Sequence, residues 1–535
     1  MQGGVTGPMR QRWKSLAALI VFIALSSLLA DRFTGSLIAS DSSAGRAQGT
    51  ISAFTKAYAL VEKNFATSVN ADNAIYDGAL PGIARSLDPH SNFLDPKEYS
   101  LWKEDQNGRY TGVGMEIIPR DNQTVVHAPF PGSPAYRAGI RPGDVIVSVD
   151  GKSTDRLSSN QVVDMLKGDR GTSVQITVRR EGVAQPISFT VVRQDILRPS
   201  VEPAFWLKPG IAYLKILSFA DYTDREMNDT LRRLGEDRIQ GLVLDLRGNP
   251  GGLLNQAVDI ADHFLRKGQV VVSQRGRNSP EKVYVADHGN RGRDYPIVVL
   301  VNRGSASAAE IVSGALQDHD RAWVLGETTF GKGLVQTVFP LPDRTALALT
   351  TAHFYTPSGR LIQRDYSHLS FFDYYTHKDG ITRNADDVKM TDSGRTVYGG
   401  GGITPDEKYQ APPIDSLEAG LYRDGIFAFT RSYFAEHSLR LPDGWMPDNA
   451  FLEQLHDYLL EHGYRFTEAQ FTADHDWIRR YLAREVYIWA FNVDSSDQVF
   501  NQSDPEVAEA VRALPQATAL LQNARRVVVE RMNRK

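Results

Sequence analysis

The sequence predicts an α/β protein of several domains, with helical regions on both sides of a βα-layered centre. The chain has 535 residues, 41% of them hydrophobic and 23% charged, which is more than one hydrophobic core usually supports. From residue 199 onward, apolar runs alternate with stretches at helical spacing, a pattern typical of βα units with parallel pairing. Residues near both ends show helical spacing without such alternation.

The composition excludes several kinds of partner and of reactive site. The net charge of −4 and the lack of a long basic run give no case for a nucleic-acid partner. The chain has no cysteine, which excludes disulfides, thiolate catalysis and zinc–thiolate sites. No H-E-x-x-H motif or clustered ligand set occurs, so we predict neither a metal site nor another cofactor.

The first forty residues have the layout of an export signal. Arg10, Arg12 and Lys14 precede an apolar run at 16–30, as in a secretory signal peptide. The run is short for a membrane helix of about twenty residues, although an uncleaved segment would serve as an anchor. We therefore expect a cell-envelope protein, periplasmic or anchored to the inner membrane, and leave cleavage open.

Residues 51–102 predict two or three helices, followed by globular domains. Within them, the segment at 86–96 is rich in turn residues and contains His90 beside Asp88. A metal ligand or a triad histidine would fit that pair. A lone histidine among turn residues is more often structural, and we favour that interpretation.

Between residues 110 and 194, two closely spaced glycines indicate a site for an anion. Gly112 and Gly114 would let successive backbone N–H groups converge on a carboxylate such as a peptide C-terminus. The same glycines also fit a tight hairpin without a ligand. A helix at 160–167 and a strand at 115–117 would form the two walls of a peptide groove.

The stretch at 301–336 combines a nucleophile with its base. An apolar run at 294–302 predicts a buried strand, and a helix is expected from 305 to about 317, which places Ser307 at a strand-to-helix turn. Ser307 and Glu310 also fit an S-x-x-E capping box. The capping interpretation therefore competes with catalysis.

A lysine between two glycines favours the catalytic interpretation of Ser307 over the capping interpretation. Lys332 lies in an apolar segment, and burial can lower the pKa of an amine so that it deprotonates a serine. Gln336 would share a strand face with Lys332 and hold its amine. The turn at 250–252 offers N–H groups for an oxyanion hole, or forms an ordinary helix start.

These motifs resemble one protein family. GSASAAEI at 304–311 and GETTFGKGLVQ at 326–336 are similar to the carboxy-terminal processing proteases, also called tail-specific proteases, which are Ser/Lys peptidases with a PDZ domain. The resemblance implies that Ser307 is the nucleophile and Lys332, 25 positions later (332 − 307), the base, with Gln336 the third catalytic residue. It also implies an oxyanion hole formed by Gly251 or Gly252 and by Ala308.

The resemblance also covers the glycine-containing segment. Residues 111–117 and 133–151 resemble the carboxylate-binding loop and the helix–turn–strand of bacterial PDZ domains. The implied peptide-binding residues are Gly112, Val113, Gly114, Met115 and Ile117.

The predicted fold class is therefore α/β multidomain, with a helical N-terminal region, a PDZ domain, a βα-layered protease core and a helical C-terminal extension. The boundaries are 1–40 for the signal peptide or anchor, 41–107, 108–195, 196–412 with an insertion at 364–397, and 413–535. We expect the insertion to be a surface excursion. Amphipathic stretches at 451–462, 477–489 and 505–531 predict the C-terminal helices.

The predicted function is a serine endopeptidase of the cell envelope that recognises protein C-termini through its PDZ domain. Its partners would be protein or peptide substrates with free C-termini, and membrane anchoring, a homo-oligomer or an adaptor stays open. One alternative is a PDZ-bearing scaffold with a degenerate protease domain, against which intact Ser307, Lys332 and Gln336 argue. Another is a Ser-His-Asp hydrolase that uses the Asp318-His319 pair.

Overall fold

The computed structural model describes residues 41–367, 373–374, 387–437, 441–442 and 444–533. Its contacts divide the chain into residues 1–80 and 81–535. The described part of the first unit contains α2 (Asp41–Asn64) and the π-helix η1 (Asn73–Ala79). The expected signal or anchor at 1–40 lies outside the described residues. No helix in the described ranges has the length and apolar character needed to cross a membrane.

The turn-rich segment after α3 (Leu80–Arg85) contains a strand, β1 (Asn92–Leu94), where the sequence indicated turns within a helical region. This strand pairs antiparallel with β18 (Ala346–Tyr355). The helix α4 (Pro96–Asn107) follows, capped at its start by the Asp95 side chain, which accepts a hydrogen bond from Glu98 N–H at 2.7 Å. Part of the predicted helical N-terminal region therefore belongs to a sheet of the protease core.

The predicted PDZ domain is a small β-sheet packed against two short helices. The sheet runs in the order β3-β4-β5-β7-β8, with β6 paired to β5, so β3 is an edge strand. Buried residues such as Val126, Ile146 and Ile176 form its core. A separate pair, β2 with β9, joins the beginning and end of the domain. The elements are β2 (Arg109–Gly112), β3 (Met115–Arg120), β4 (Gln123–Pro129), α5 (Pro134–Ala138), β5 (Val145–Val149), β6 (Lys152–Ser153), α6 (Ser159–Leu166), β7 (Ser173–Arg179), β8 (Ile187–Val192) and β9 (Gln194–Leu197).

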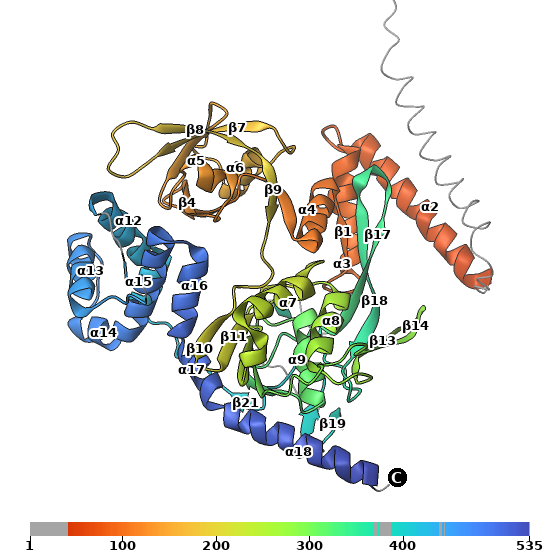
Figure 1. Ribbon diagram of the computed structural model, residues 1–535. Coiled ribbons are helices and arrows are strands. Elements are labelled where there is room, and N and C mark those ends of the chain that lie inside the picture. Colours follow the sequence, from red (N-terminus) through yellow and green to blue (C-terminus); the bar gives the residue numbers. More distant parts are fainter. Residues whose placement is uncertain (1–40, 368–372, 375–386, 438–440, 443, 534–535) are drawn as a thin grey trace, which may run out of the picture. The chain divides into compact units, whose positions relative to one another are not determined.

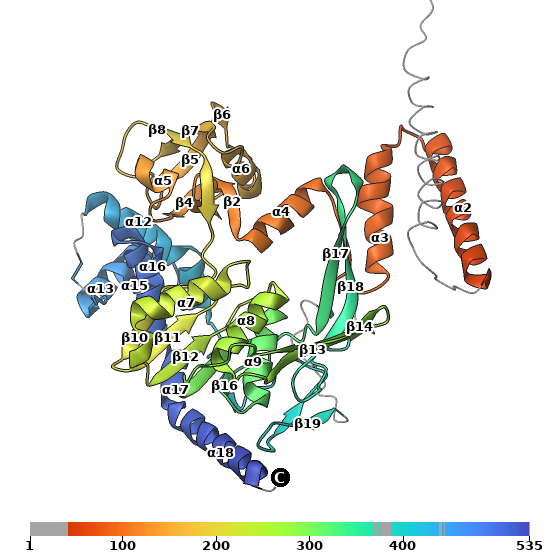
Figure 2. The same ribbon diagram turned by 45° about the vertical axis from the view of Figure 1, so that its right-hand side comes forward.

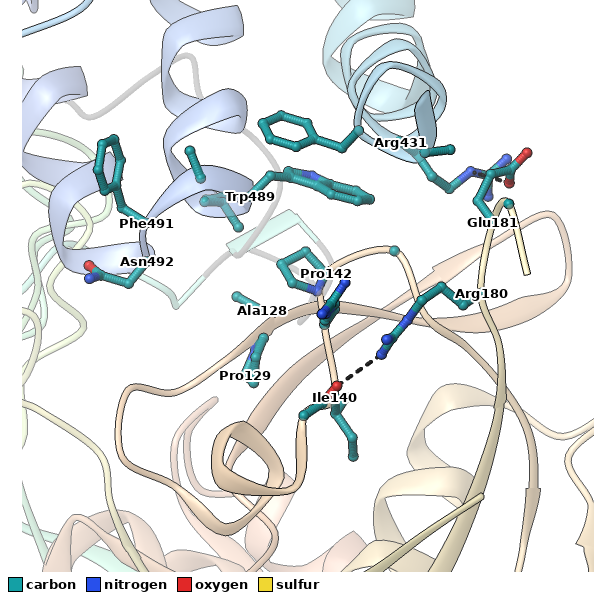
Figure 3. A pocket seen from close by; sticks show the side chains of 18 of the residues that line it. Ala128, Pro129, Ile140, Pro142, Arg180, Glu181, Arg431, Trp489, Phe491 and Asn492 are labelled. Atoms are coloured by element: carbon teal, nitrogen blue, oxygen red, sulfur yellow. Dashed lines mark hydrogen bonds and ion pairs between the residues drawn. The ribbon is translucent and has the colours of Figure 1, made fainter. Parts of the chain in front are cut away.

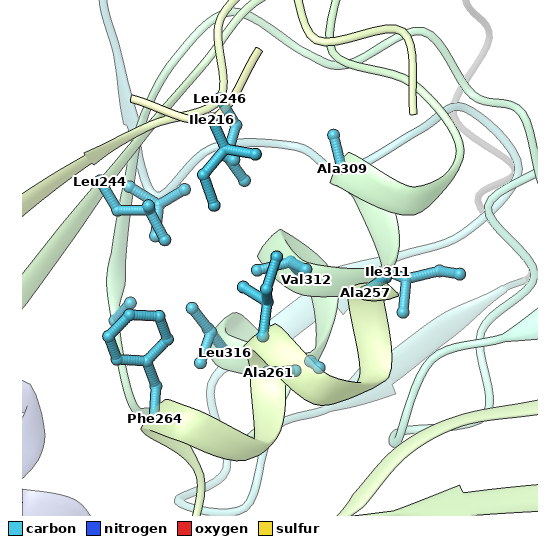
Figure 4. Packing of buried hydrophobic residues seen from close by; sticks show 14 of the residues in the cluster. Ile216, Leu244, Leu246, Ala257, Ala261, Phe264, Ala309, Ile311, Val312 and Leu316 are labelled. Carbon is cyan, nitrogen blue, oxygen red and sulfur yellow. The ribbon is translucent and has the colours of Figure 1, made fainter. Parts of the chain in front are cut away.

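A six-stranded sheet forms the centre of the protease core, in the order β10-β11-β12-β15-β16-β21. All its pairs are parallel except β10 with β11, as the βα alternation predicted. The helices α7, α8 and α9 follow its strands (Figures 1 and 2). Residues of α8 and α9, among them Phe264, Val312 and Leu316, pack with Leu244 and Ile216 of the sheet side (Figure 4). The elements are β10 (Phe205–Lys208), β11 (Ile211–Lys215), α7 (Thr223–Leu234), η2 (Glu236–Arg238), β12 (Gly241–Asp245), α8 (Leu254–Phe264), β15 (Ile297–Val301), α9 (Ala308–Asp318), β16 (Trp323–Gly326) and β21 (Glu407–Lys408).

The second face of this sheet is covered by the end of the chain. Residues Val507, Ala510 and Leu514 of α17 (Pro505–Arg512) and α18 (Leu514–Asn533) pack with Val243, Val298 and Leu300. These two helices therefore complete the protease core, which extends past the predicted boundary at residue 412.

A second, antiparallel sheet carries β1 and the hairpin of β17 and β18, with strand order β1-β18-β13-β14 and β17 paired to β18. The described residues of the insertion differ in exposure: Tyr374 is only 1% exposed, whereas Val388 and Met390 are 41% and 58% exposed. The expectation of a surface excursion stays a prediction, with Tyr374 buried against the core. The remaining elements here are β13 (Val270–Gly276), β14 (Ser279–Val285), β17 (Leu334–Pro340), η3 (Pro342–Arg344), β19 (Val388–Met390) and β20 (Thr396–Tyr398).

The C-terminal extension is helical, as predicted. Aromatic and aliphatic residues, including Phe429, Leu455 and Leu482, form its own core. A pocket of about 620 Å³ lies between these helices and the PDZ domain, where Trp489 lies over Pro142 (Figure 3). The elements are α11 (Ser416–Gly420), η4 (Leu421–Gly425), α12 (Ile426–Glu436), α13 (Asn449–Glu461), α14 (Glu468–Ala473), α15 (His475–Ala490) and α16 (Val493–Gln502).

Candidate active site

Ser307 lies at the N-terminus of α9 in a strained backbone conformation, with φ 53° and ψ −111°. A positive φ at a residue other than glycine costs about 1–3 kcal/mol and persists only where the surroundings impose it. Ser307 N–H donates to the Glu310 carboxylate at 2.8 Å, and Glu310 N–H donates to the Ser307 carbonyl at 2.9 Å. The capping partner predicted from the sequence is therefore present, but it does not remove the strain.

The neighbouring Ser305 has a different role. It is fully buried, and its hydroxyl donates to the Leu246 carbonyl at 2.8 Å while accepting from Asn302 N–H at 3.0 Å. These bonds join the serine loop to the end of β12. Ser305 is therefore a structural cross-link, in contrast to Ser307.

The predicted base and its positioning amide are adjacent. Lys332 Nζ donates to Gln336 Oε1 at 3.1 Å. Burial lowers the pKa of Lys332, against the opposing charges of Glu310 and Asp88. Ser307, Lys332 and Gln336 line one pocket of about 1,090 Å³. Among the hydrogen bonds of the described residues, none joins the Lys332 amine to Ser307 Oγ. Hydrogen bonds between catalytic groups often form only when substrate is bound.

Glu310, which the sequence marked only as a cap, connects the serine turn to the lysine loop. Its Oε2 accepts from the N–H groups of Ser307 at 2.8 Å and Lys332 at 2.9 Å. Its Oε1 accepts from Thr329 Oγ1 at 2.5 Å and Gly331 N–H at 2.7 Å. Burial raises the pKa of this carboxyl group, while these four donors oppose the rise. One carboxylate thus fixes the main chain at both of the positions predicted to be catalytic, Ser307 and Lys332.

The predicted oxyanion-hole residues lie next to Ser307. A Cβ on Gly251 would come within 2.8 Å of Ser307 Cβ and 3.0 Å of Ala308 N, and its φ of 99° also requires glycine. Gly251 N–H donates to Asn249 Oδ1 at 2.8 Å, so that donor is already used. Of the two glycines left open by the sequence, Gly252 therefore fits the oxyanion role better, together with Ala308.

Arg247 connects this loop to the C-terminal helices. It donates to the buried Asp245 through Nε at 3.0 Å and through a terminal nitrogen at 2.6 Å. Its other terminal nitrogen donates to Asp504 at 2.9 Å and Glu506 at 2.7 Å. Burial raises the pKa of Glu506 to about 7, although Arg247 opposes the rise. No pattern in the sequence indicated these C-terminal partners.

His90, expected to be structural, lines the same pocket as Ser307 and Lys332. Its main-chain carbonyl accepts from Gln336 Nε2 at 2.5 Å, while its ring Nε2 lies 2.9 Å from the Tyr374 hydroxyl. Burial, with the nearby charge of Lys332, lowers the pKa of His90 to about 4. The contribution to the site comes from a carbonyl group, which leaves no sequence signature.

The Ser-His-Asp alternative finds no support in the geometry. His319 Nδ1 bonds to Asp392 at 2.8 Å and its Nε2 to the Val270 carbonyl at 2.7 Å. Asp318 pairs with Arg360 at 2.6 Å. No cluster of three or more potential metal ligands occurs among the described residues.

In the PDZ domain, the predicted peptide-binding segment lies along the edge strand β3. The side chains of Val113 and Met115 are buried, and Ile117 packs partly against the same core. Gly114 has a φ of 79°, and its carbonyl accepts from Ser133 Oγ at 2.6 Å. The edge position of β3 suits the addition of a peptide strand. The side chains of Val113 and Met115 belong to the core of the domain. Gly112 ends β2 beside this segment.

Comparison with known proteins identifies the family. A carboxy-terminal-processing protease of Bartonella bacilliformis is 40% identical over 297 residues, which cover 55% of this chain and 68% of that protein. The carboxy-terminal processing protease CtpA of Bacillus subtilis is 32% identical over 389 residues, covering 70% of this chain and 83% of that protein. The chain belongs to the carboxy-terminal processing protease family.

The family models agree with this assignment. Peptidase family S41 matches residues 210–367, and the PDZ domain matches 125–180. Among solved structures, the photosystem II D1 C-terminal processing protease is 27% identical, covering 69% of this chain and 90% of that one, with a TM-score of 0.36. On the family models and the two relatives, the protein is a peptidase with a PDZ domain, and the resemblance predicted from the sequence is confirmed. The roles of Ser307, Lys332 and Gln336 stay predictions.

Proposed function

We propose that this peptidase is a serine endopeptidase with a Ser/Lys mechanism, in which Ser307 is the nucleophile and Lys332 the general base. The main support is that strained Ser307 and desolvated Lys332 line one pocket and share Glu310 as a main-chain acceptor. Strained residues in clefts are a recurrent feature of active sites. A degenerate scaffold would have no need of this arrangement.

In the proposed reaction, the neutral Lys332 amine takes the proton of Ser307 Oγ as that oxygen attacks a peptide carbonyl. N–H groups of Gly252 and Ala308 stabilise the oxyanion. Lys332 then protonates the departing amine, leaving an acyl-enzyme on Ser307. A water molecule gives its proton to Lys332 and attacks the ester, after which the amine returns the proton to Ser307.

Substrate selection is proposed to rest on the PDZ domain. The free edge of β3 would take up the substrate's C-terminal strand, and N–H groups between Gly112 and Met115 would bind its carboxylate. We further propose a cell-envelope location, because of the basic and apolar pattern of the first forty residues.

The chemistry is tested by Ser307→Ala and Lys332→Ala, each expected to lower peptide cleavage at least about a thousandfold, as loss of a nucleophile or base does elsewhere. Products are identified by mass spectrometry, with and without a chelator. Ser305→Ala is not a neutral control, because Ser305 is a buried cross-link; Ser393→Ala, on the β19–β20 turn, is preferable. Cleavage by Ser307→Ala at the normal rate would contradict the mechanism.

Tail recognition is tested separately with peptides of one sequence carrying a free or an amidated C-terminus. The free peptide should be cut faster, because amidation leaves the N–H groups of the loop without a charged partner. Equal rates would contradict the role of the PDZ domain and leave the Ser/Lys chemistry standing.

A further inference from the structure

Tyr374, in the insertion at 364–397, lies immediately behind the catalytic pocket. Its side chain is only 1% exposed. The hydroxyl lies 2.9 Å from His90 Nε2 and 3.3 Å from Gln363 Nε2. The ring makes edge contacts with His90, at a centroid distance of 5.3 Å, and with Phe330, at 5.7 Å. Tyr374 therefore contacts two separate segments that lead to catalytic residues.

The first segment is the turn at 88–91. Asp88 Oδ1 accepts from the N–H groups of His90 and Ser91, both at 2.8 Å, and Oδ2 accepts from Ser91 Oγ at 2.7 Å. Such a side-chain-closed turn fixes the direction of the next carbonyl. Here the His90 carbonyl accepts from Gln336 Nε2.

This contact determines how Gln336 meets the base. A carbonyl only accepts hydrogen bonds, so the NH₂ end of the Gln336 amide must face His90. The oxygen end is then left for Lys332 Nζ, at 3.1 Å. An uncharged amine that donates to this oxygen can direct its lone pair elsewhere, as a base for Ser307 requires. The His90 carbonyl thus selects the useful orientation of the amide.

The second segment is the lysine loop. Gln363 accepts from Gly333 N–H at 2.9 Å through Oε1 and donates to the Tyr374 hydroxyl through Nε2. The Arg364 guanidinium lies 4.0 Å from the ring centroids of both Phe330 and Tyr374. The hydroxyl can accept from Gln363 Nε2 and donate its own proton to His90 Nε2 at the same time. The low pKa of His90 agrees with a neutral ring that accepts this proton.

We propose that Tyr374 is a positioning residue for the reaction: by joining the turn at 88–91 to the loop at 330–333, it keeps the His90 carbonyl on Gln336 and so orients the Lys332 amine. This inference rests on the proposed Ser/Lys function. It gives the insertion a part in catalysis without contact with the substrate.

The direct test is Tyr374→Phe, which removes only the hydroxyl. We expect kcat to fall about tenfold with KM unchanged, which corresponds to a loss of about 1.4 kcal/mol in transition-state stabilisation. The rate at which a fluorophosphonate probe labels the serine should fall equally. The matched control is Tyr464→Phe, which removes a hydroxyl bonded to Asp424 at 2.9 Å in the C-terminal helices and should leave both rates unchanged. Thermal unfolding verifies that each variant is folded.

A double-mutant cycle with Gln336→Ala tests the route of the effect. If Tyr374 acts through Gln336, Tyr374→Phe will slow labelling in the parent enzyme but add nothing in the Gln336→Ala background. A wild-type rate for Tyr374→Phe, a changed KM alone, or an equal loss in both backgrounds would overturn the proposal. Ser307→Ala separates the two hypotheses: if that variant is still labelled, the proposed function itself fails, whatever Tyr374→Phe shows.

Discussion

Two buried carboxylate sites support the active site, and they differ in where their partners come from. Glu310 binds four neutral donors, all within 22 residues of it in the sequence. Asp245 instead pairs with Arg247, which continues to Asp504 and Glu506, 257 and 259 residues further along the chain. The proposed nucleophile and base are thus fixed locally, whereas the proposed oxyanion loop is joined through Arg247 to the C-terminal helices. The local site should be the more sensitive to a single change.

The largest effect is expected for Glu310→Gln. An amide keeps one oxygen but turns an NH₂ group toward donors, so at least one N–H group of the catalytic loops loses its partner, at about 1–3 kcal/mol. We expect peptide cleavage to fall about a hundredfold, because the same change displaces both Ser307 and Lys332.

The matched control is Asp262→Asn, in which another buried carboxylate accepts from two N–H groups, those of His288 and Gly289, away from the catalytic pocket. It should lower the melting temperature but keep kcat. Comparable loss of kcat in both variants would show that Glu310 has no special relation to the site.

A smaller effect is expected at the distant site for the double variant Asp504→Asn, Glu506→Gln. Arg247 keeps Asp245 but loses both C-terminal carboxylates, so the oxyanion loop becomes less firmly fixed and kcat should fall about tenfold. Glu509→Gln, an exposed carboxylate of the same helix that pairs with Arg512, should change nothing in steady-state assays. If the double variant keeps full kcat, the C-terminal helices do not support the oxyanion loop.

The smallest effect is expected in the pH dependence of the melting temperature, and it concerns Glu506 of the distant site. Because the pKa of Glu506 is raised in the folded protein to about 7, its contribution to stability is full below its unfolded pKa of about 4.3 and is lost as pH rises through about 7. The melting temperature of the parent protein should therefore fall relative to that of Glu506→Gln between pH 5 and pH 8. Parallel curves for the two proteins over this range would refute the assignment.

The sequence predicted the local half of the site and missed the distant half, for a physical reason. Ser307 and Glu310 share one strand–turn–helix unit, β15 to α9, and Lys332 follows 22 residues after Glu310 in the loop between β16 and β17. The turn chemistry and apolar runs of this short stretch are visible in the sequence. The contact of Gln336 with His90 spans 246 residues, and that of His90 with Tyr374 spans 284. The first involves a carbonyl that every residue has, and the second a tyrosine in a segment without a recognisable pattern.

The same difference between local patterns and distant contacts explains which parts of the fold the sequence predicted. Alternating strands and helices predicted the βα layering, and the PDZ domain was confirmed. The strand β1 was missed because its three residues, Asn92–Leu94, gain stability only by pairing with β18. The role of α17 and α18 as the second layer of the protease sheet could not be predicted either, since an amphipathic pattern does not identify what its apolar face will cover.

This second layer has a practical consequence for producing the enzyme. The region matched by the S41 model, residues 210–367, contains the proposed catalytic residues Ser307 and Lys332, and its boundaries invite expression as a minimal fragment. Such a fragment would expose to solvent the apolar face formed by Tyr213, Val243, Val298, Leu300 and Leu325, which α17 and α18 cover in the full chain. Exposed apolar surfaces of this kind promote self-association. A soluble catalytic fragment should therefore retain the last two helices, supplied in the same chain or as a separate peptide.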